Sequence, residues 1–203
     1  MATRLFFRET TNLNTSYPTA GDKSAVLPVG TDGGDFNQSQ DLSLLNNGVA
    51  TNLTYTQLAQ TTQQSAMIAR FTSPRLRSQT INANTWTIVF TGDEANAAAN
   101  AFLGLSVYAW RPSTSAVVGF VRDSTTTLGV EFNNTLQTLT FSGSAVTVES
   151  GDILVAEVWN VATSSMATSY LITFTTSNTA NPRYLETPQD LAFTGSEQVF
   201  IID

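Results

Sequence analysis

Side chains that could perform chemistry are few in this sequence, and they are mostly carboxylates without the usual catalytic partners. The chain has 203 residues, with 16 Asp and Glu, 9 Lys and Arg, and neither histidine nor cysteine. A Ser-His-Asp triad, a thiolate nucleophile, an imidazole base and a cysteine zinc site are therefore excluded. We predict no catalytic residue, no metal ligand and no cofactor.

The carboxylates suggest three arrangements, and each has a simpler structural interpretation. Glu131 and Glu157 lie in predicted strands and would form a glycosidase pair only with their carboxyl groups about 5–9.5 Å apart. The adjacent pair Asp93-Glu94 is expected in a solvated loop. Residues 32–41 offer oxygen ligands at loop spacing, but they lack the terminal glutamate of a known calcium loop. We expect a plain turn there.

The charge of the chain excludes some partners. The formal net charge is −7 and the nine basic residues are scattered, whereas a nucleic-acid groove needs clustered Lys and Arg. No window approaches the roughly 20 apolar residues of a membrane span, and residues 1–14 lack the apolar stretch of a secretory signal. We expect a soluble protein made in a cytoplasm, with neither nucleic acid nor membrane as a partner.

The elements that must position these residues are predicted to be strands. From about residue 65 the chain consists of short β-rich runs separated by turn residues, which is typical of a sandwich or barrel. The fold class predicted is all-β, an antiparallel, jelly-roll-like β-sandwich with extended terminal arms. The predicted strands cover residues 66–72, 80–91, 102–111, 116–122, 129–132, 136–141, 145–149, 153–159 and 169–175.

Alternation of apolar and polar residues indicates which side chains form the core. The predicted core residues are Trp86, Ile88, Phe90, Val146, Val148, Ile153 and Val155. The predicted strands 145–149 and 153–159 are joined by Glu149-Ser150-Gly151-Asp152. This sequence predicts a hairpin or a corner of the sandwich. Asp152 is expected to accept hydrogen bonds from nearby backbone amides in this turn.

The run 102–111 is apolar on both of its faces. One face is predicted to join the core, and the other is predicted to be an interface or to lie under a loop. Trp110 is followed by Arg111 and Pro112, so its ring either covers the sheet or offers a platform for a sugar. We favour the covering role.

The rest of the chain is divided into flanking segments. Residues 1–40 show little periodicity and are predicted to be an extended N-terminal arm. Residues 41–64 are a connecting segment that could contain one helical turn capped by Asp41. The sandwich domain is predicted over 65–180, with an exposed loop and one helical turn at 92–101, and residues 181–203 form a C-terminal arm.

Apolar residues near both termini would be poorly placed in water, so we expect them to bind another subunit. Removal of the arms should then spare the fold and abolish assembly. Together with the second apolar face of 102–111, this argument predicts a homotrimer or a lattice contact between subunits that covers one face. The candidate assembly contacts are Leu5, Phe6, Phe7, Tyr108, Trp110, Phe200, Ile201 and Ile202.

Four segments resemble a group of β-rich structural proteins of tailed bacteriophages. They are MATRLFFRETT (1–11), VYAWRPSTSAVVGFVRD (107–123), VTVESGDILVAEVW (146–159) and YLETPQDLAF (184–193). The resemblance implies a virion component with no catalytic motif. In size, composition and inferred fold the chain also resembles, more loosely, the jelly-roll cement or decoration proteins that sit on capsid surfaces at local three-fold positions.

The function expected from this resemblance is that of a bacteriophage virion structural protein, and not of an enzyme. It would be a capsid cement or decoration protein on the capsid surface, with the major capsid protein and itself as partners. One alternative is a tail-fibre, knob or head-fibre module. A second is a carbohydrate-binding jelly roll that uses Tyr108, Trp110 or Trp159, and a polysaccharide depolymerase comes last.

Overall fold

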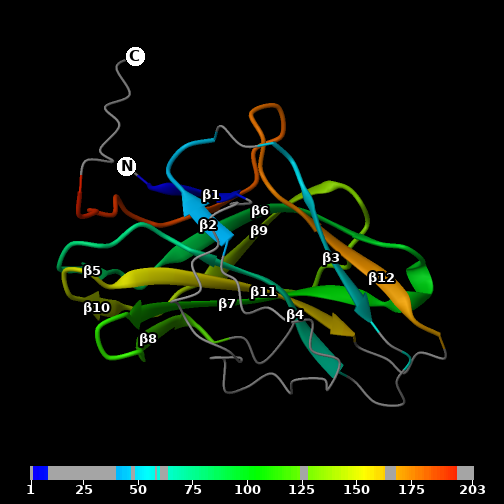
Figure 1. Ribbon diagram of the computed structural model, residues 1–203, viewed down its shortest axis with the longest axis horizontal. Coiled ribbons are helices and arrows are strands. Elements are labelled where there is room, and N and C mark those ends of the chain that lie inside the picture. Colours follow the sequence, from blue (N-terminus) through cyan, green and yellow to red (C-terminus); the bar gives the residue numbers. More distant parts are fainter. Residues whose placement is uncertain are drawn as a thin grey trace.

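The computed structural model describes residues 2–8, 40–46, 49–57, 59, 64–123, 128–162 and 168–195. Within these ranges the chain is built almost wholly from strands, with one 3-10 turn, η1, at Ala97–Ala99 (Figure 1). The predicted all-β fold class is confirmed. The strands are β1 (Arg4–Arg8), β2 (Gln40–Ser43), β3 (Asn52–Gln57), β4 (Gln64–Thr72), β5 (Gln79–Ile81), β6 (Thr85–Glu94), β7 (Ala101–Arg111), β8 (Ala116–Arg122), β9 (Leu136–Ser142), β10 (Val146–Val148), β11 (Ile153–Ala162), β12 (Tyr170–Thr175) and β13 (Tyr184–Glu186). No helix in the described part of the chain is long and apolar enough to cross a membrane.

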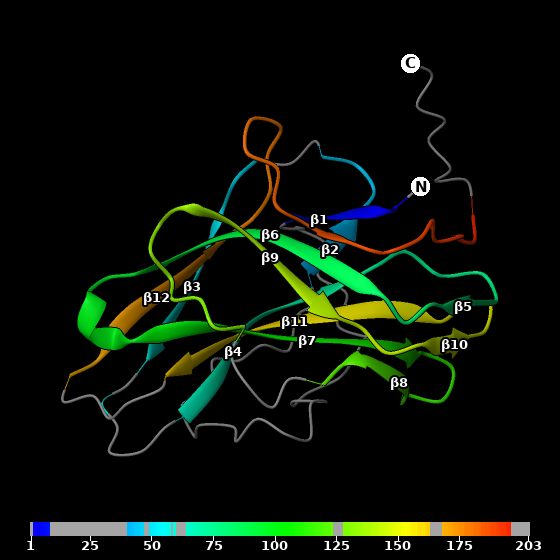
Figure 2. The same ribbon diagram turned by 180° about the vertical axis from the view of Figure 1, so that it is seen from behind.

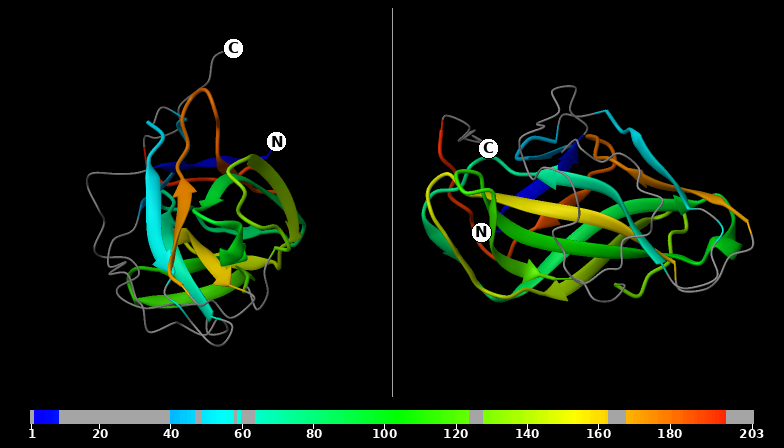
Figure 3. Two further views of the ribbon diagram at one scale, coloured as in Figure 1. Left: turned by 90° about the vertical axis from the view of Figure 1, so that its right-hand side faces the viewer. Right: turned by 60° about the horizontal axis from the view of Figure 1, so that its bottom comes forward.

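A continuous hydrogen-bonded path runs through most of the strands in the order β3-β12-β6-β13-β1-β2-β4-β11-β7-β8, with β9 paired to β6 beside it. The pairing of β2 with β4 is parallel, whereas the other strand pairs are antiparallel. β5 and β10 form a separate two-stranded sheet. The path folds over at β1 and β2, so the antiparallel halves pack face to face as a sandwich around the core (Figures 2 and 3).

The main core lies between these halves. Trp86, Ile88 and Phe90 of β6 are fully buried in it, and Val146 and Val148 of β10 join the same cluster. These are five of the predicted core residues, on the strand faces that alternation indicates.

A second buried region lies on the other face of β7 and β11. Every residue of β11 is buried, and β7 is partly exposed only at Phe102, its second residue, and at Arg111, its last. Because successive side chains point to opposite faces, a strand without exposed positions must be covered on both sides. The residues of this second region are Met67, Tyr108, Trp110, Ile153, Val155, Trp159 and Val161. The predicted core residues Ile153 and Val155 therefore lie here and not in the main core.

The predicted division of the chain is wrong at both ends. β1 lies within the sheet, between β13 and β2, with Leu5 opposite Leu185 and Phe7 opposite Leu42. β13 in turn lies between β1 and β6. The described parts of the predicted arms, 1–40 and 181–203, thus belong to the sandwich. Local periodicity missed them because each strand is short and its partner is far away in the sequence.

The connecting segment 41–64 also differs from the prediction. A strand, β2, replaces the helical turn expected after Asp41, and β3 adds an edge strand to β12. Leu42 is fully buried opposite Phe7, so tertiary pairing overrides the local capping signal. The turn at 149–152 is a corner and not a hairpin, because β10 pairs with β5 while β11 pairs with β4 and β7.

Candidate functional site

The structure does not leave the predicted N-terminal contacts available to a partner. Leu5 and Phe7 have no exposed surface, and the Phe7 ring lies edge-on against Phe71 and Phe174, with ring centroids 4.8 and 5.4 Å away. Phe6 is partly exposed and packs edge-on against Tyr184 at 5.7 Å. The prediction that Leu5 and Phe7 bind another subunit is wrong, because their alternate positions on β1 face the main core.

Tyr108 and Trp110 are likewise buried within the single chain, at 0% and 2% exposed, so the prediction of assembly through them is wrong. Trp159 is 1% exposed. None of the three offers an aromatic platform to a sugar, which removes the basis of the carbohydrate-binding alternative. It also removes the argument that a homotrimer is needed to cover this face. The predicted contacts Phe200, Ile201 and Ile202, and the oxygen-rich stretch up to residue 39, lie outside the described residues.

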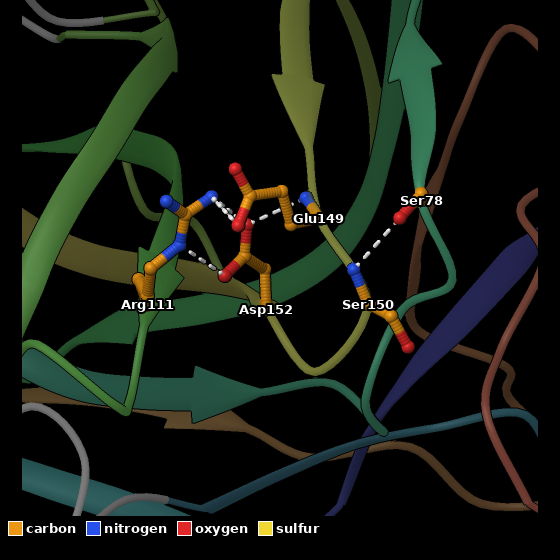
Figure 4. Close-up of polar contacts among 5 residues, drawn as sticks. All are labelled: Ser78, Arg111, Glu149, Ser150 and Asp152. Carbon is orange, nitrogen blue, oxygen red and sulfur yellow. Dashed lines mark hydrogen bonds and ion pairs between the residues drawn. The ribbon is translucent and has the colours of Figure 1, made fainter.

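The best-defined cluster of ionised side chains lies at the corner between β10 and β11. The Asp152 carboxylate accepts a hydrogen bond from the Glu149 amide at 2.8 Å, which confirms the predicted role of Asp152 in the turn (Figure 4). Gly151 has φ +98°, a left-handed conformation that glycine adopts without strain. The turn therefore forms at the Gly-Asp pair and directs the carboxylate back into the corner.

Arg111, at the end of β7, completes this corner. Its Nε and Nη2 atoms donate to the two oxygens of Asp152 at 2.9 and 3.0 Å, and Nη2 also lies 3.3 Å from Glu149 Oε2. The two parallel bonds to Asp152 form the bidentate geometry that makes an arginine–carboxylate pair strong. The Asp152 side chain is 2% exposed, that of Arg111 26%, and that of Glu149 70%. The inner pair is thus shielded from water and the outer one is not.

The electrostatics of the corner favour an ionised Asp152. Burial acts to raise the pKa of Asp152, but the hydrogen bonds from Arg111 and from the Glu149 amide, with the charge of Arg111, outweigh it. The pKa therefore lies below its ordinary value. A carboxylate held ionised and fully bonded is a poor general acid, so this geometry is suited to holding the chain together.

Backbone contacts tie the corner to the segment before β5. Ser150 N–H donates to Ser78 Oγ at 3.0 Å (Figure 4), Gly151 N–H to the Leu76 carbonyl at 2.9 Å, and Leu76 N–H to the Asp152 carbonyl at 2.7 Å. Three separate parts of the chain thus meet at this end of the sandwich. We call Arg111, Glu149 and Asp152 the corner clamp.

A second ion pair lies inside the buried second face. Arg70 Nε donates to Glu157 Oε1 at 3.1 Å, and the Tyr108 hydroxyl donates to the same oxygen at 2.8 Å. Both charged side chains have no exposed surface. Such a pair needs hydrogen bonds to offset the cost of removing its charges from water. Glu157 is therefore engaged in a structural network on β11.

Two carboxylates, Asp93 and Glu94, lie at the C-terminal end of β6, and neither takes part in the ion pairs described above. β6 extends through Asp93 and Glu94, so the predicted solvated loop begins only after them. Glu94 Oε2 accepts a bond from the Ala101 amide at 2.9 Å. The pKa of Glu94 is raised, mainly by burial and further by the neighbouring carboxylates Glu131 and Asp93, although the Ala101 bond opposes the rise. Glu131 thus neighbours Glu94, whereas Glu157 bonds to Arg70 and Tyr108.

In the part of the chain that the structure describes, no group of three or more acidic side chains is arranged to hold a metal ion. Sequence reasoning brought neither Arg70 and Tyr108 to Glu157 nor Arg111 to Asp152. For the Glu157 contacts, the signal that could have found them is a charged residue, Glu157, within the predicted strand 153–159, whose other residues are all apolar.

No family model matches this sequence, and no curated protein matches it. Among solved structures, the chain was matched to the crystal structure of an aminopeptidase from the marine sediment archaeon Thaumarchaeota archaeon, with a TM-score of 0.43 and 8% sequence identity over 92% of this chain. The match covers 36% of that protein, so this chain spans about a third of its length.

Proposed function

We propose that this protein is a non-enzymatic structural component of a bacteriophage particle, a capsid cement or decoration protein that binds the major capsid protein on the shell surface. The observation that carries the proposal concerns the four segments that resemble phage structural proteins. Their described residues form strands of the sandwich, and the ionised side chains of the corner clamp, which belong to these segments, bond to one another.

Each of these segments contributes to a junction between distant parts of the chain. The described residues of 1–11 supply β1, which pairs with β13 from the segment 184–193. The segment 107–123 supplies Arg111, and 146–159 supplies Glu149 and Asp152, so the corner clamp joins these two segments. The segments that resemble phage proteins are thus ones that hold the sandwich together. This supports a function that depends on the shape of the folded chain.

The mechanism follows from the closed fold. A body whose apolar faces are already covered is stable alone, and it can then bridge capsid subunits by adding buried contact area across their boundaries. A specific interface buries about 1,200–2,000 Å² in total, and such contacts raise the work needed to separate the subunits they join. No catalytic group is required for this role.

The proposal is tested with shells of the encoding phage that lack this protein. Purified full-length chain is added, and bound protein is measured by co-sedimentation and the temperature of shell rupture by calorimetry. We expect saturable binding at a fixed ratio to the major capsid protein and a higher rupture temperature. Failure to bind shells, or binding without a change in rupture temperature, would contradict the cement role. Labelling confined to the tail or to fibres of intact particles would replace it with the fibre alternative.

A further inference from the structure

β9 is an edge strand, and no strand in the described part of the chain pairs with its outer side. It pairs with β6 over seven residues in one unbroken register, from Thr85 opposite Ser142 to Thr91 opposite Leu136. Among the described strands, β6 is the one that pairs with it. Figure 2 shows β9 beside β6 on the near side of the molecule.

The register also shows which backbone groups of β9 point outward. Gly143 N–H donates to the Asn84 carbonyl at 2.8 Å, so residue 143 faces the β6 side. Because alternate residues of an antiparallel strand direct both backbone groups to the same side, residues 141, 139 and 137 also face β6. The N–H and C=O groups of Leu136, Thr138, Thr140 and Ser142 therefore point away from the sheet, and these same four residues are exposed.

Natural proteins protect such edges with charged residues, proline or β-bulges. β9, with the sequence LQTLTFS, contains no charge and no proline, and its pairing with β6 shows no bulge. The edge strand β8 is a useful contrast, because it has two register shifts against β7 and ends in Arg122. β9 thus retains a regular, uncharged edge that can accept another strand.

We propose that two copies of this chain pair through β9, antiparallel, about a two-fold axis at Leu139. Full overlap of residues 136–142 with the same residues of a second copy places Thr138 opposite Thr140, Leu136 opposite Ser142, and Leu139 opposite itself. A two-fold interface must be self-complementary, which means that if residue i faces residue j, then j also faces i. This register meets that condition.

The lack of charge along β9 and its exposed apolar surface both favour a second copy as the occupant. The chain carries a net charge of −7, yet pairing along β9 brings no charged residue of the strand against another. Leu136 is 51% exposed and is one of the few large apolar side chains exposed in the described residues. Leu139 is partly buried against the main core, and in the pair it would meet its own copy at the edge of that core.

The pairing extends the half of the sandwich that contains β6 and β9 into a sheet shared by two molecules. It is independent of the proposed role in a phage particle, because it concerns the purified chain alone. It replaces the predicted homotrimer contact through Tyr108 and Trp110 with a contact through a sheet edge.

The test measures self-association of the full chain by sedimentation velocity at concentrations up to about 100 µM. In the double variant Thr138→Lys/Thr140→Lys, introduced ammonium groups face each other across the two-fold axis, and the dimer dissociation constant should rise at least about tenfold. In the variant Thr138→Lys/Thr140→Glu each ammonium faces a carboxylate, and dimerisation should return. The matched control Thr54→Lys/Thr56→Lys, at exposed positions of the edge strand β3, should leave dimerisation unchanged.

Circular dichroism and thermal melting establish that each variant is folded. A wild-type chain that stays monomeric at about 100 µM overturns the proposal. So does a folded Lys/Lys variant that dimerises as tightly as the wild type, or a Lys/Glu variant that is as weak as Lys/Lys. If the Lys/Lys variant does not fold, the Lys/Glu variant decides: dimers whose amides at 138 and 140 are protected support the pairing, and monomers overturn it.

Discussion

β11 and β9 show two ways in which a strand of this molecule meets its surroundings. β11 lies between β4 and β7, and every residue in it is buried. β9 has β6 as its one strand neighbour among the described residues, and its exposed side chains alternate with covered ones. The difference teaches that this chain buries the side chains of its central strands, whereas β9 keeps an edge with no strand partner among the described residues.

Replacing a large side chain on the second buried face should have the largest effect. Trp110→Ala removes a nearly fully buried ring and should lower the free energy of unfolding by about 3–5 kcal/mol, without weakening self-association. Chemical denaturation of the full chain measures the first effect and sedimentation the second. The control is Leu136→Ala on β9, which should cost at most about 0.5 kcal/mol. A stable Trp110→Ala variant that no longer self-associates would show that this face is an interface.

The next largest effect is expected on β1, which belongs to the closed part of the molecule. Phe7→Ala should destabilise the fold by about 3–4 kcal/mol, because its ring fills the main core between Phe71 and Phe174. Its neighbour Phe6 is the matched control. Phe6→Ala removes one edge-on contact with Tyr184 and should cost about 1 kcal/mol. Equal costs for the two substitutions, measured by denaturation, would mean that β1 is not anchored through one face.

The corner clamp should give a smaller, pH-dependent effect. Because the pKa of Asp152 lies below its ordinary value in the fold, its stabilisation is complete above the unfolded pKa of about 4 and is lost as the pH falls through the folded value. Asp152→Asn should cost about 1–3 kcal/mol at pH 7, and its difference from the wild type should shrink at pH 3. Denaturation at the two pH values measures this.

Glu94 should affect the pH dependence of stability in the opposite direction to Asp152. Its pKa is raised, mainly by burial, so its ionised form opposes folding at neutral pH. Glu94→Gln should therefore be as stable as the wild type or more stable at pH 7, and the difference should vanish in acid. A difference that grows in acid for both Asp152→Asn and Glu94→Gln would contradict these two assignments.

The smallest effect on folding is expected at the open edge. Thr138→Lys changes an exposed side chain whose backbone groups do not bond β6, so the dilute, monomeric chain should lose no more than about 0.5 kcal/mol. A larger loss, measured by denaturation at low concentration, would mean that β9 is covered within its own chain.

Sequence reasoning succeeded where the relevant signal is local. Alternation around Trp86 and the Gly151-Asp152 pair predicts β6 and the corner turn, because both depend on neighbouring residues. It failed where the signal is a pairing across the chain. Leu5 lies opposite Leu185, and Arg111 bonds to Asp152, over separations that no local pattern encodes. For the same reason the apolar run around Tyr108 and Trp110 indicated a covered face but not what covers it.

The central claim, that this chain closes its faces and associates through an edge, is tested most directly by hydrogen exchange of the full chain at a low and a high concentration. We predict that the outward amides of β9, at residues 138 and 140, exchange fast in the dilute chain and become protected on concentration. The amides of β7 and β11 should be protected equally at both. Unchanged exchange in β9, together with protection gained at Tyr108 and Trp110 on concentration, would contradict the account.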